Sequence, residues 1–286
     1  MATDRKIRIE LLTEPAQFRQ CVRLQKMIWG RNYEDIVPLS MFLVANRNGG
    51  ITLGALTRKG EVAGFVFGIP GLDESGVIHW SEMLGVRKEY WGRDFGYQLK
   101  VQQREQALRM GIRMIHWTFD PLQSKNAYLN FFRLGGYTRT YEPNFYGASK
   151  SPLHRGLDTD RFVVTWPINS QRVRDRLSAV DEGRPAAVFH QDVPPALSAR
   201  VPARGPVRPG ETLLDLQTER IKVEVPFDIV KLKSSSLPVA REWQKKVRLI
   251  FQYYFARGYT VVDFYKAKDR YPTGFYILQK HFSAVV

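Results

Sequence analysis

The chain has a single cysteine, Cys21, among its 286 residues, so no disulfide can form within it. Apolar residues near it, such as Phe18 and Leu24, follow an amphipathic helical pattern. We therefore expect a packed thiol rather than a nucleophile. Histidine is also scarce, with five residues, and no Cys/His or His/Glu spacing is typical of a metal site. We predict no metal.

Long apolar runs are missing as well. No stretch approaches the roughly 20 apolar residues that a membrane-spanning helix needs, and the first six residues lack the apolar segment of a signal peptide. We therefore expect a cytoplasmic protein with no membrane partner. The 44% of hydrophobic residues are enough for a packed core in one large or two small domains.

Acidic residues are outnumbered, because 28 Asp and Glu face 43 Lys and Arg and leave a net charge of +15. Such a balance first suggests a nucleic-acid partner. However, the basic residues are spread along the chain, and no zinc-finger or RNA-binding signature is present. A surface suited to a phosphorylated cofactor and an acidic substrate explains the charge about as well, so nucleic acid is the less favoured partner.

The stretch over 77–137 alternates strands and helices around one basic turn. Apolar patterning and the glycines at 111, 135 and 136 divide it. The elements that it predicts are a strand over 77–86, a turn over 87–96, a helix over 97–110, a strand over 112–119 and a helix over 126–134.

The basic turn predicts a phosphate site. Where a strand leads into a helix through a turn with glycine, the first helical N–H groups have no internal partner and the helix dipole adds partial positive charge. Arg87, Lys88 and Arg93 surround the turn with full charges. A tight turn with solvated charges remains an alternative from these residues alone.

The turn resembles the acyl-CoA-binding turn of the GNAT superfamily of N-acyltransferases. That family has Leu-x-Val at the strand end, then Arg/Gln-x-x-Gly-x-Gly/Ala opening a helix. Here Leu84-Gly85-Val86 and the segment from Trp91 to Gly96 occupy these places. Trp91 stands where the family has Arg or Gln, and Asp94 stands where it has the first Gly.

A second landmark of the family lies downstream. It consists of an Asn, a small residue, an aromatic pair and Gly-aromatic, and here it is Asn126-Ala127, Phe131-Phe132 and Gly136-Tyr137 in the same order and spacing. The amino-acid sequences of segments 117–122, 144–147 and 160–162 resemble those of a bacterial GNAT subfamily with a C-terminal extension. The resemblance is firmest from Phe18 to Trp166.

The resemblance implies an α/β (α+β) fold, with a GNAT-like mixed central sheet flanked by helices and a smaller C-terminal α/β extension. We place an acyl-CoA N-acyltransferase domain at 1–168, a proline-rich linker at 169–210 and the extension at 211–286. The passage 255–262 echoes 108–115, so the extension is either a degenerate GNAT-like half or a generic helix–strand joint.

The extension also contains an apolar helix that starts at Pro238. Its broad apolar stripe needs a cover, either the first domain or a second copy in a homo-oligomer.

The family's chemistry is direct attack of an amine on the thioester of acetyl-CoA or another acyl-CoA. The resemblance implies a small amine or amino acid as acceptor, and a basic pocket favours a carboxylate-bearing donor such as succinyl-CoA. Glu82 is the first candidate base and His79 the second. Glu82 as a salt-bridged structural carboxylate is an equal alternative.

Many family members protonate the leaving thiolate with a Tyr at the position of Phe132, which has no proton to give. Tyr128, Tyr141 and Tyr146 are the substitutes, and Tyr128 and Tyr146 are retained as candidates. The candidate CoA contacts are Leu84, Val86, Arg87, Lys88, Arg93, Phe95, Gly96 and Asn126. Because of Trp91, Asp94 and Phe132, a catalytically inactive GNAT-fold binding or regulatory protein is the alternative.

Overall fold

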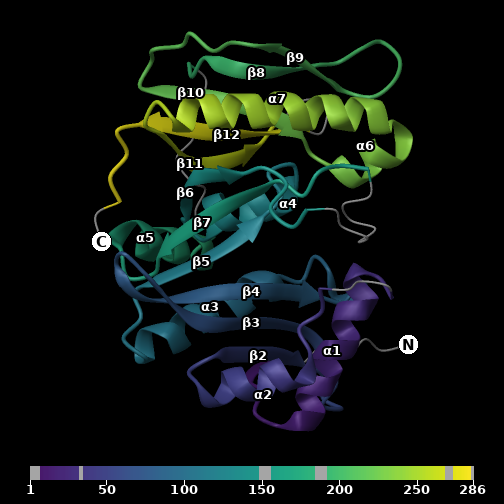
Figure 1. The fold of residues 1–286 in the computed structure, drawn as a ribbon, viewed down its shortest axis with the longest axis vertical. Coiled ribbons are helices and arrows are strands. Elements are labelled where there is room, and N and C mark those ends of the chain that lie inside the picture. Colours follow the sequence, from purple (N-terminus) through teal and green to yellow (C-terminus); the bar gives the residue numbers. More distant parts are fainter. Residues whose placement is uncertain (1–6, 32–34, 148–155, 184–191, 268–272, 285–286) are drawn as a thin grey trace. The chain divides into compact units, whose positions relative to one another are not determined.

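The computed structural model describes residues 7–31, 35–147, 156–183, 192–267 and 273–284. Packing divides them into two compact units, one up to Trp117 and the other from Thr118 onward (Figure 1). Each unit is a sheet with helices, so the predicted α/β class is confirmed. The division into 1–168, 169–210 and 211–286 stays a prediction.

The first unit contains a five-stranded mixed sheet in the order β1-β2-β3-β4-β5. Strands β1 to β4 pair antiparallel, and β4 pairs parallel with β5 at His79 with Ile115 and at Trp80 with His116. Strand β4 pairs with β3 over residues 76–80 and again over residues 83–86. The strands are β1 (Arg8–Leu11), β2 (Ile51–Leu56), β3 (Val62–Asp73), β4 (Gly76–Val86) and β5 (Met114–Phe119).

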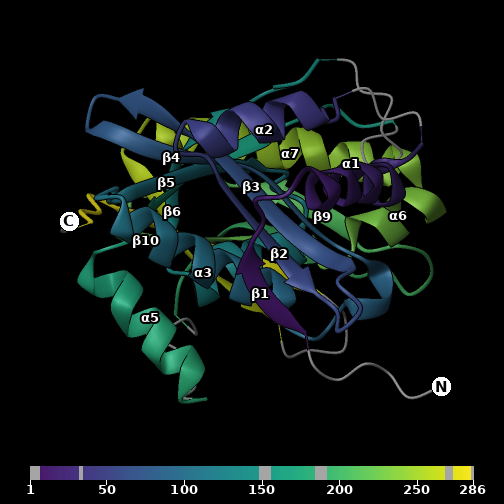
Figure 2. The same cartoon turned by 90° about the horizontal axis from the view of Figure 1, so that it is seen from below.

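Helices cover both faces of this sheet. Helices α1 (Pro15–Trp29) and α2 (Leu39–Arg47) lie on one face and α3 (Phe95–Arg109) on the other (Figure 2). Helix α1 begins with a proline in its first turn and ends at Gly30. Cys21 is fully buried in the core between α1, α2 and the sheet, and burial raises its pKa to about 12. The predicted packed thiol is confirmed.

Strand β4 carries a bulge that the sequence did not predict. Phe67 of β3 pairs with Met83 and Ile69 pairs with Trp80, so Ser81 and Glu82 together oppose Gly68. A Cβ on Gly68 would lie 2.3 Å from His79 Nε2 and 2.5 Å from the Trp80 carbonyl oxygen. The bulge therefore requires glycine at this position.

The second unit contains a sheet in the order β7-β6-β11-β12-β10-β8-β9. Strands β10 and β8 pair parallel, and the other described pairs are antiparallel. Strand β8 and the start of β9 come from the proline-rich stretch predicted as a linker. The strands are β6 (Tyr137–Glu142), β7 (Arg161–Pro167), β8 (Pro195–Arg200), β9 (Arg208–Thr212), β10 (Arg220–Pro226), β11 (Tyr259–Lys266) and β12 (Thr273–Lys280).

The helices of the second unit are α4 (Ser124–Ala127), the π-helical turn η2 (Tyr128–Arg133), α5 (Gln171–Asp181), α6 (Ile229–Ser235) and α7 (Leu237–Phe255). Helix α7 begins next to Pro238, as predicted. It packs against β6, β8, β9, β10 and β11, which bury its apolar stripe, including Trp243 and Phe251. The second unit therefore covers this stripe by itself, and a homo-oligomer stays a prediction.

Candidate functional site

The connection from β4 to α3 has the local geometry of an anion site. A short 3₁₀ turn, η1 (Lys88–Tyr90), follows β4, and then Gly92 and Asp94 both have positive φ, at 77° and 60°. Asp94 is the N-cap of α3 and makes no side-chain cap hydrogen bond. Aspartate tolerates the left-handed region better than most residues. Asp94 thus adopts a conformation suited to glycine, the residue that the GNAT pattern has here.

Helix α3 starts at Phe95, two residues before the predicted start, so Phe95 and Gly96 lie in its first turn. The first hydrogen bond into the helix runs from the Gln98 N–H to the Asp94 carbonyl, at 3.0 Å. The preceding first-turn N–H groups have no acceptor within a helix and attract anions. The Asp94 carboxylate at the same end opposes that attraction.

Trp91 folds back onto the end of β4. Its Nε1–H donates to the Val86 carbonyl at 2.8 Å, while its side chain is 59% exposed. The predicted role of Val86 was to offer backbone groups to the pantetheine of CoA. Its carbonyl already has an indole donor in this conformation, so a pantetheine that binds there must displace Trp91 or share the carbonyl with it.

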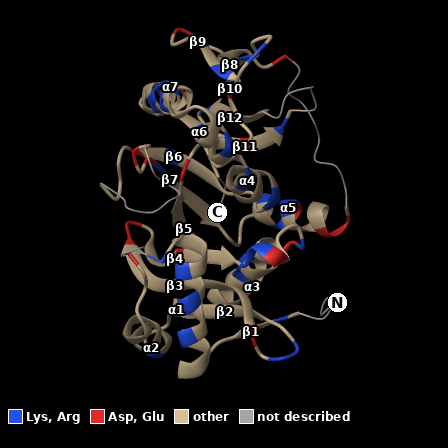
Figure 3. Cartoon of the chain, turned by 90° about the vertical axis from the view of Figure 1, so that its right-hand side faces the viewer, with Lys and Arg blue, Asp and Glu red and all other residues tan. Residues whose placement is uncertain are grey.

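The three cations of the turn differ in their pairing. The Arg87 guanidinium contacts Glu89 at 2.6 Å and Glu61 at 3.7 Å. The pKa of Glu89 is lowered, first by a hydrogen bond from its own backbone and then by Arg87. Lys88 and Arg93 are exposed and make no ion pair within the described residues. They are therefore the cations best placed to attract a phosphate. Further basic residues lie along α1 (Figure 3).

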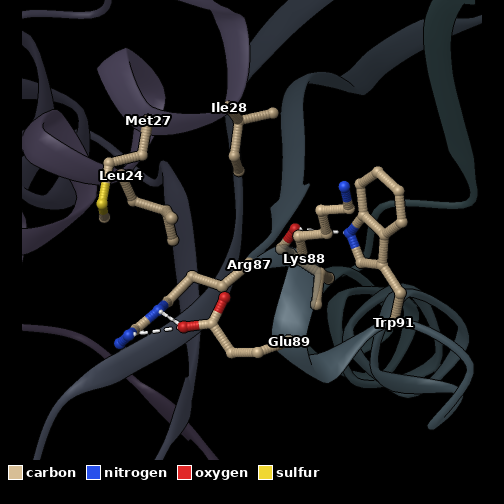
Figure 4. A pocket seen from close by; sticks show the side chains of 8 residues that line it. Leu24, Met27, Ile28, Arg87, Lys88, Glu89 and Trp91 are labelled. Atoms are coloured by element: carbon tan, nitrogen blue, oxygen red, sulfur yellow. Dashed lines mark hydrogen bonds and ion pairs between the residues drawn. The ribbon is translucent and has the colours of Figure 1, made fainter.

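Two adjoining pockets lie beside this turn. The first, of about 260 Å³, has apolar residues of α1 on one side and the end of β4 with the turn on the other (Figure 4). The second, of about 380 Å³, shares Met27 and Arg87 with it. The first is lined by Leu24, Met27, Ile28, Val86, Arg87, Lys88, Glu89 and Trp91; the second adds Gln20, Arg23, Lys59, Gly60, Glu61 and Val62. An apolar floor with a charged rim suits an amphipathic ligand.

Glu82, the first candidate base, lies exposed on the β4 bulge. Its Oε2 accepts a hydrogen bond from Trp80 Nε1 at 3.0 Å. Ile69, which pairs with Trp80, packs against the core of α1 and α2. Residues directly opposite in a sheet share a face, so Trp80 and its bonded Glu82 lie on the α1/α2 side. Within the described residues Glu82 makes no ion pair, unlike the salt-bridged alternative.

His79 lies on the other face, fully buried beneath α3. Its Nε2 is 3.0 Å from Gln103 Nε2. Burial, and to a lesser extent the nearby Lys100, lower the His79 pKa to about 3. His79 is therefore a poor match to its predicted role as second base, because its burial separates it from solvent. Ser81, Lys100 and Gln103 contact one another here, a cluster that sequence patterning missed.

The remaining candidates belong to the second unit. Asn126 is exposed on α4. The Tyr128 ring stacks on Phe132 at 4.6 Å and lies 4.0 Å from Lys266 Nζ. The hydroxyl of Tyr146, an exposed residue, is 3.3 Å from Thr118 Oγ1. Of the two retained candidates, Tyr146 is the more accessible proton donor.

Tyr141, the third tyrosine considered, is buried. Its hydroxyl donates to Asp160 Oδ2 at 2.6 Å. Burial and then the Asp160 charge raise its pKa well above the usual value. Tyr141 is therefore committed to a structural hydrogen bond rather than to proton transfer.

The described residues contain no cluster of three or more His, Cys, Asp or Glu side chains that could hold a metal ion. Among them, every helix is too short or too polar to cross a bilayer.

The first unit is thus a mixed α/β fold in which a basic strand–turn–helix connection leads from β4 to α3. No protein-family model matches the sequence. A search of curated proteins also finds no match. Solved structures that the chain is similar to include several acetyltransferases.

Three of these structures indicate the degree of similarity. A GNAT-family acetyltransferase from Streptococcus pneumoniae is 18% identical with a TM-score of 0.45, over 56% of this chain and 98% of its own. The ribosomal-protein-S18-alanine N-acetyltransferase from Escherichia coli is 15% identical with a TM-score of 0.46, over 57% and 94%. NAA60 from Arabidopsis thaliana, in complex with a bisubstrate analogue, is 16% identical with a TM-score of 0.46, over 57% and 100%. These likenesses carry no activity over to this chain.

Proposed function

We propose that the chain is an acyl-CoA-dependent N-acyltransferase that moves an acetyl or succinyl-like group to a small amine or amino acid. The observation that carries this proposal is the β4–α3 connection. Asp94 holds the left-handed conformation at the GNAT glycine position, and the first turn of α3 has no side-chain cap from it. Lys88 and Arg93 add charge suited to a pyrophosphate. A protein that consumes acyl-CoA would work in the cytoplasm.

In this proposal the pockets between α1 and the turn receive part of the acyl-CoA. Glu82 does not line either pocket. Glu82, exposed on the α1/α2 side, would take the proton of the acceptor ammonium, directly or through water. The amine would then attack the thioester carbonyl, and the thiolate of CoA would leave with a proton from water or from a tyrosine. Leu84, Phe95 and Gly96 would contact the CoA arm.

The competing proposal is a GNAT-fold protein without catalytic activity. Its support is the Asp94 carboxylate at the helix terminus, the Trp91 indole on the Val86 carbonyl at 2.8 Å, and Phe132 at the family's tyrosine position. Such a protein would keep the pockets for binding or regulation.

Calorimetric titration with acetyl-CoA and succinyl-CoA separates the two proposals. A carboxylate about 4 Å from a phosphate costs about 1 kcal/mol in water, so Asp94→Gly is expected to tighten binding about fivefold. Asp94→Asn is the matched control, because it removes the charge and keeps a residue that tolerates positive φ. Equal gains in both variants identify the charge as the cause.

A panel of amines and amino acids, assayed by thiol release from the bound donor, then tests transfer. Binding and turnover by the unaltered protein support the acyltransferase. Binding restored in Asp94→Gly alone favours the inactive protein. Absence of binding in all three proteins overturns the CoA proposal.

A further inference from the structure

A buried polar network lies beneath the β4 bulge, between β4 and α3. Lys100 Nζ donates to Ser81 Oγ at 2.8 Å and to Gln103 Oε1 at 3.2 Å. Ser81 Oγ–H also donates to Gln103 Oε1, at 2.9 Å. With its oxygen accepting both bonds, the Gln103 amide N–H₂ donates to His79 Nε2 at 3.0 Å. The four side chains therefore form one connected network.

The centre of this network is a lysine in an apolar setting. Lys100 is 2% exposed, and its Nζ lies 3.8 Å from the centre of the Trp117 ring. It has no acidic partner within the described residues, and burial lowers its pKa well below the usual value. A hydroxyl, an amide oxygen and a ring face together satisfy the three donors of an ammonium group.

An apolar residue at position 100 would avoid the desolvation cost of this lysine. A buried polar network, however, favours the one conformation in which all its hydrogen bonds form over others that pack about as well. We infer that this network holds Ser81 on the α3 side and thereby stabilises the β4 bulge. Ser81 faces α3 and Met83 lies in the α1/α2 core, although residues two apart in a regular strand share a face.

The side on which Ser81 lies also sets the direction of Glu82, because neighbouring residues of a strand point to opposite faces. With Ser81 held beneath the sheet and Gly68 opposite, Glu82 stands on the α1/α2 side, bonded to Trp80 at 3.0 Å. A slip by one residue would move each side chain to the other face. The proposed base would then lie under α3, on the face opposite α1 and α2.

We propose that Lys100 and Gln103 are positioning residues that lock the β4 bulge through Ser81 and thereby aim Glu82 at the acceptor. The effect of these residues on the bulge does not depend on catalytic activity. Their effect on turnover rests on the proposed function.

Amide hydrogen exchange tests the lock directly. Ser81→Ala and Lys100→Met are expected to speed exchange at Glu82 and Met83 about tenfold or more relative to Leu53 of β2, since each removes a buried hydrogen-bond partner. Thr52→Val is the matched control, because it removes a buried hydroxyl that has no partner within the described residues. Ser81→Thr retains a hydroxyl and is expected to exchange like the unaltered protein.

Exchange at Glu82 and Met83 in Ser81→Ala that is unchanged relative to Leu53, as in Thr52→Val, would overturn the lock. Ser81→Ala also decides the question if Lys100→Met does not fold, because it removes one small hydroxyl and leaves the amine its amide partner.

Turnover tests the second half of the proposal. With a donor and acceptor found by thiol release, kcat of Ser81→Ala is expected to fall about 10- to 100-fold, the range for a misplaced catalytic group. The dissociation constant for acyl-CoA is expected to stay within about twofold, because the charged candidate contacts Arg87, Lys88 and Arg93 lie on the turn. An equal loss of kcat and acyl-CoA affinity would contradict positioning. An unaltered protein that binds no acyl-CoA overturns the proposed function, and hydrogen exchange still decides the lock.

Discussion

Gly68 lies at a position where there is no space for a side chain. It opposes two residues of the bulge, and a Cβ there would lie 2.3 Å from His79 Nε2 and 2.5 Å from the Trp80 carbonyl. The carbonyl belongs to the backbone and cannot move aside as a flexible side chain would.

Gly68→Ala is expected to destabilise the protein by about 1–3 kcal/mol, the usual cost of overpacking a filled site. Gly71→Ala on the same strand is the control, because its Cβ would meet Ile78 at an ordinary 3.4 Å. That change is expected to be neutral or slightly stabilising. Urea unfolding midpoints compare the two variants, and equal midpoints would contradict the steric argument.

Lys100 shows why part of the site was invisible in the sequence. The pattern of 97–110 puts Leu99, Gln103, Ala107 and Met110 on one side of the predicted helix. The first three are buried, whereas Met110, just past the end of α3, is 46% exposed. A lysine beside Leu99 is usually a solvent-facing residue, and its partner Ser81 belongs to another element. The three-residue spacing of Lys100 and Gln103 was the one available signal, and its meaning depends on a bulge that local patterning does not predict.

Asp94, unlike Lys100, could be recognised as unusual from the sequence. Its departure from the glycine of the GNAT pattern was visible in the sequence, and it pointed to the position with φ of 60°. The charge conflict could be predicted from the sequence, whereas the retained left-handed backbone could not.

At the scale of elements, a buried ion pair ties α7 to the start of β7. Arg248 donates to both oxygens of Asp160, at 2.6 and 2.9 Å, and Tyr141 donates to the same carboxylate. Asp160 has a side-chain exposure of 1%. Its carboxylate and the hydrogen bonds raise the Arg248 pKa above the usual value.

Arg248→Met is expected to destabilise the fold by about 2–4 kcal/mol, because it leaves a buried carboxylate without its cation. Arg200→Met provides the control, since Arg200 pairs with Glu211 at 3.0 Å with both side chains mostly exposed. That change is expected to cost less than about 1 kcal/mol. Thermal unfolding measures both, and equal losses would show that Asp160 is satisfied without Arg248.

The predicted ends of helices match the observed ends where a capping residue and the apolar periodicity indicate the same position. Helix α7 starts next to Pro238, which predicted it, and α3 ends before Gly111. The π-helical η2 was predicted as an ordinary helix over 126–134, because its extra residue per turn leaves no mark in the pattern. Strands β8 and β9 were missed because their prolines favoured a linker.

At the scale of the whole molecule, the charge of +15 is spread over both units, as Figure 3 shows. Dispersed charge binds DNA weakly through counterion release. With about four phosphate contacts, affinity is expected to fall about 100-fold between 50 and 200 mM NaCl.

Two duplexes of unrelated sequence are expected to bind equally in fluorescence anisotropy. Tight binding that resists salt and prefers one duplex would contradict this expectation and favour a nucleic-acid function. The absence of a dense basic tract in the sequence was enough to predict this behaviour.

The exposed indole of Trp91 also has an optical consequence. Trp117, Trp166 and Trp243 are buried, whereas Trp91 is 59% exposed at the rim of the first pocket. Its emission therefore lies toward the red, and soluble quenchers reach it first. Any ligand that occupies the turn must cover this ring or displace it from Val86, so the native protein carries its own fluorescent reporter of occupancy.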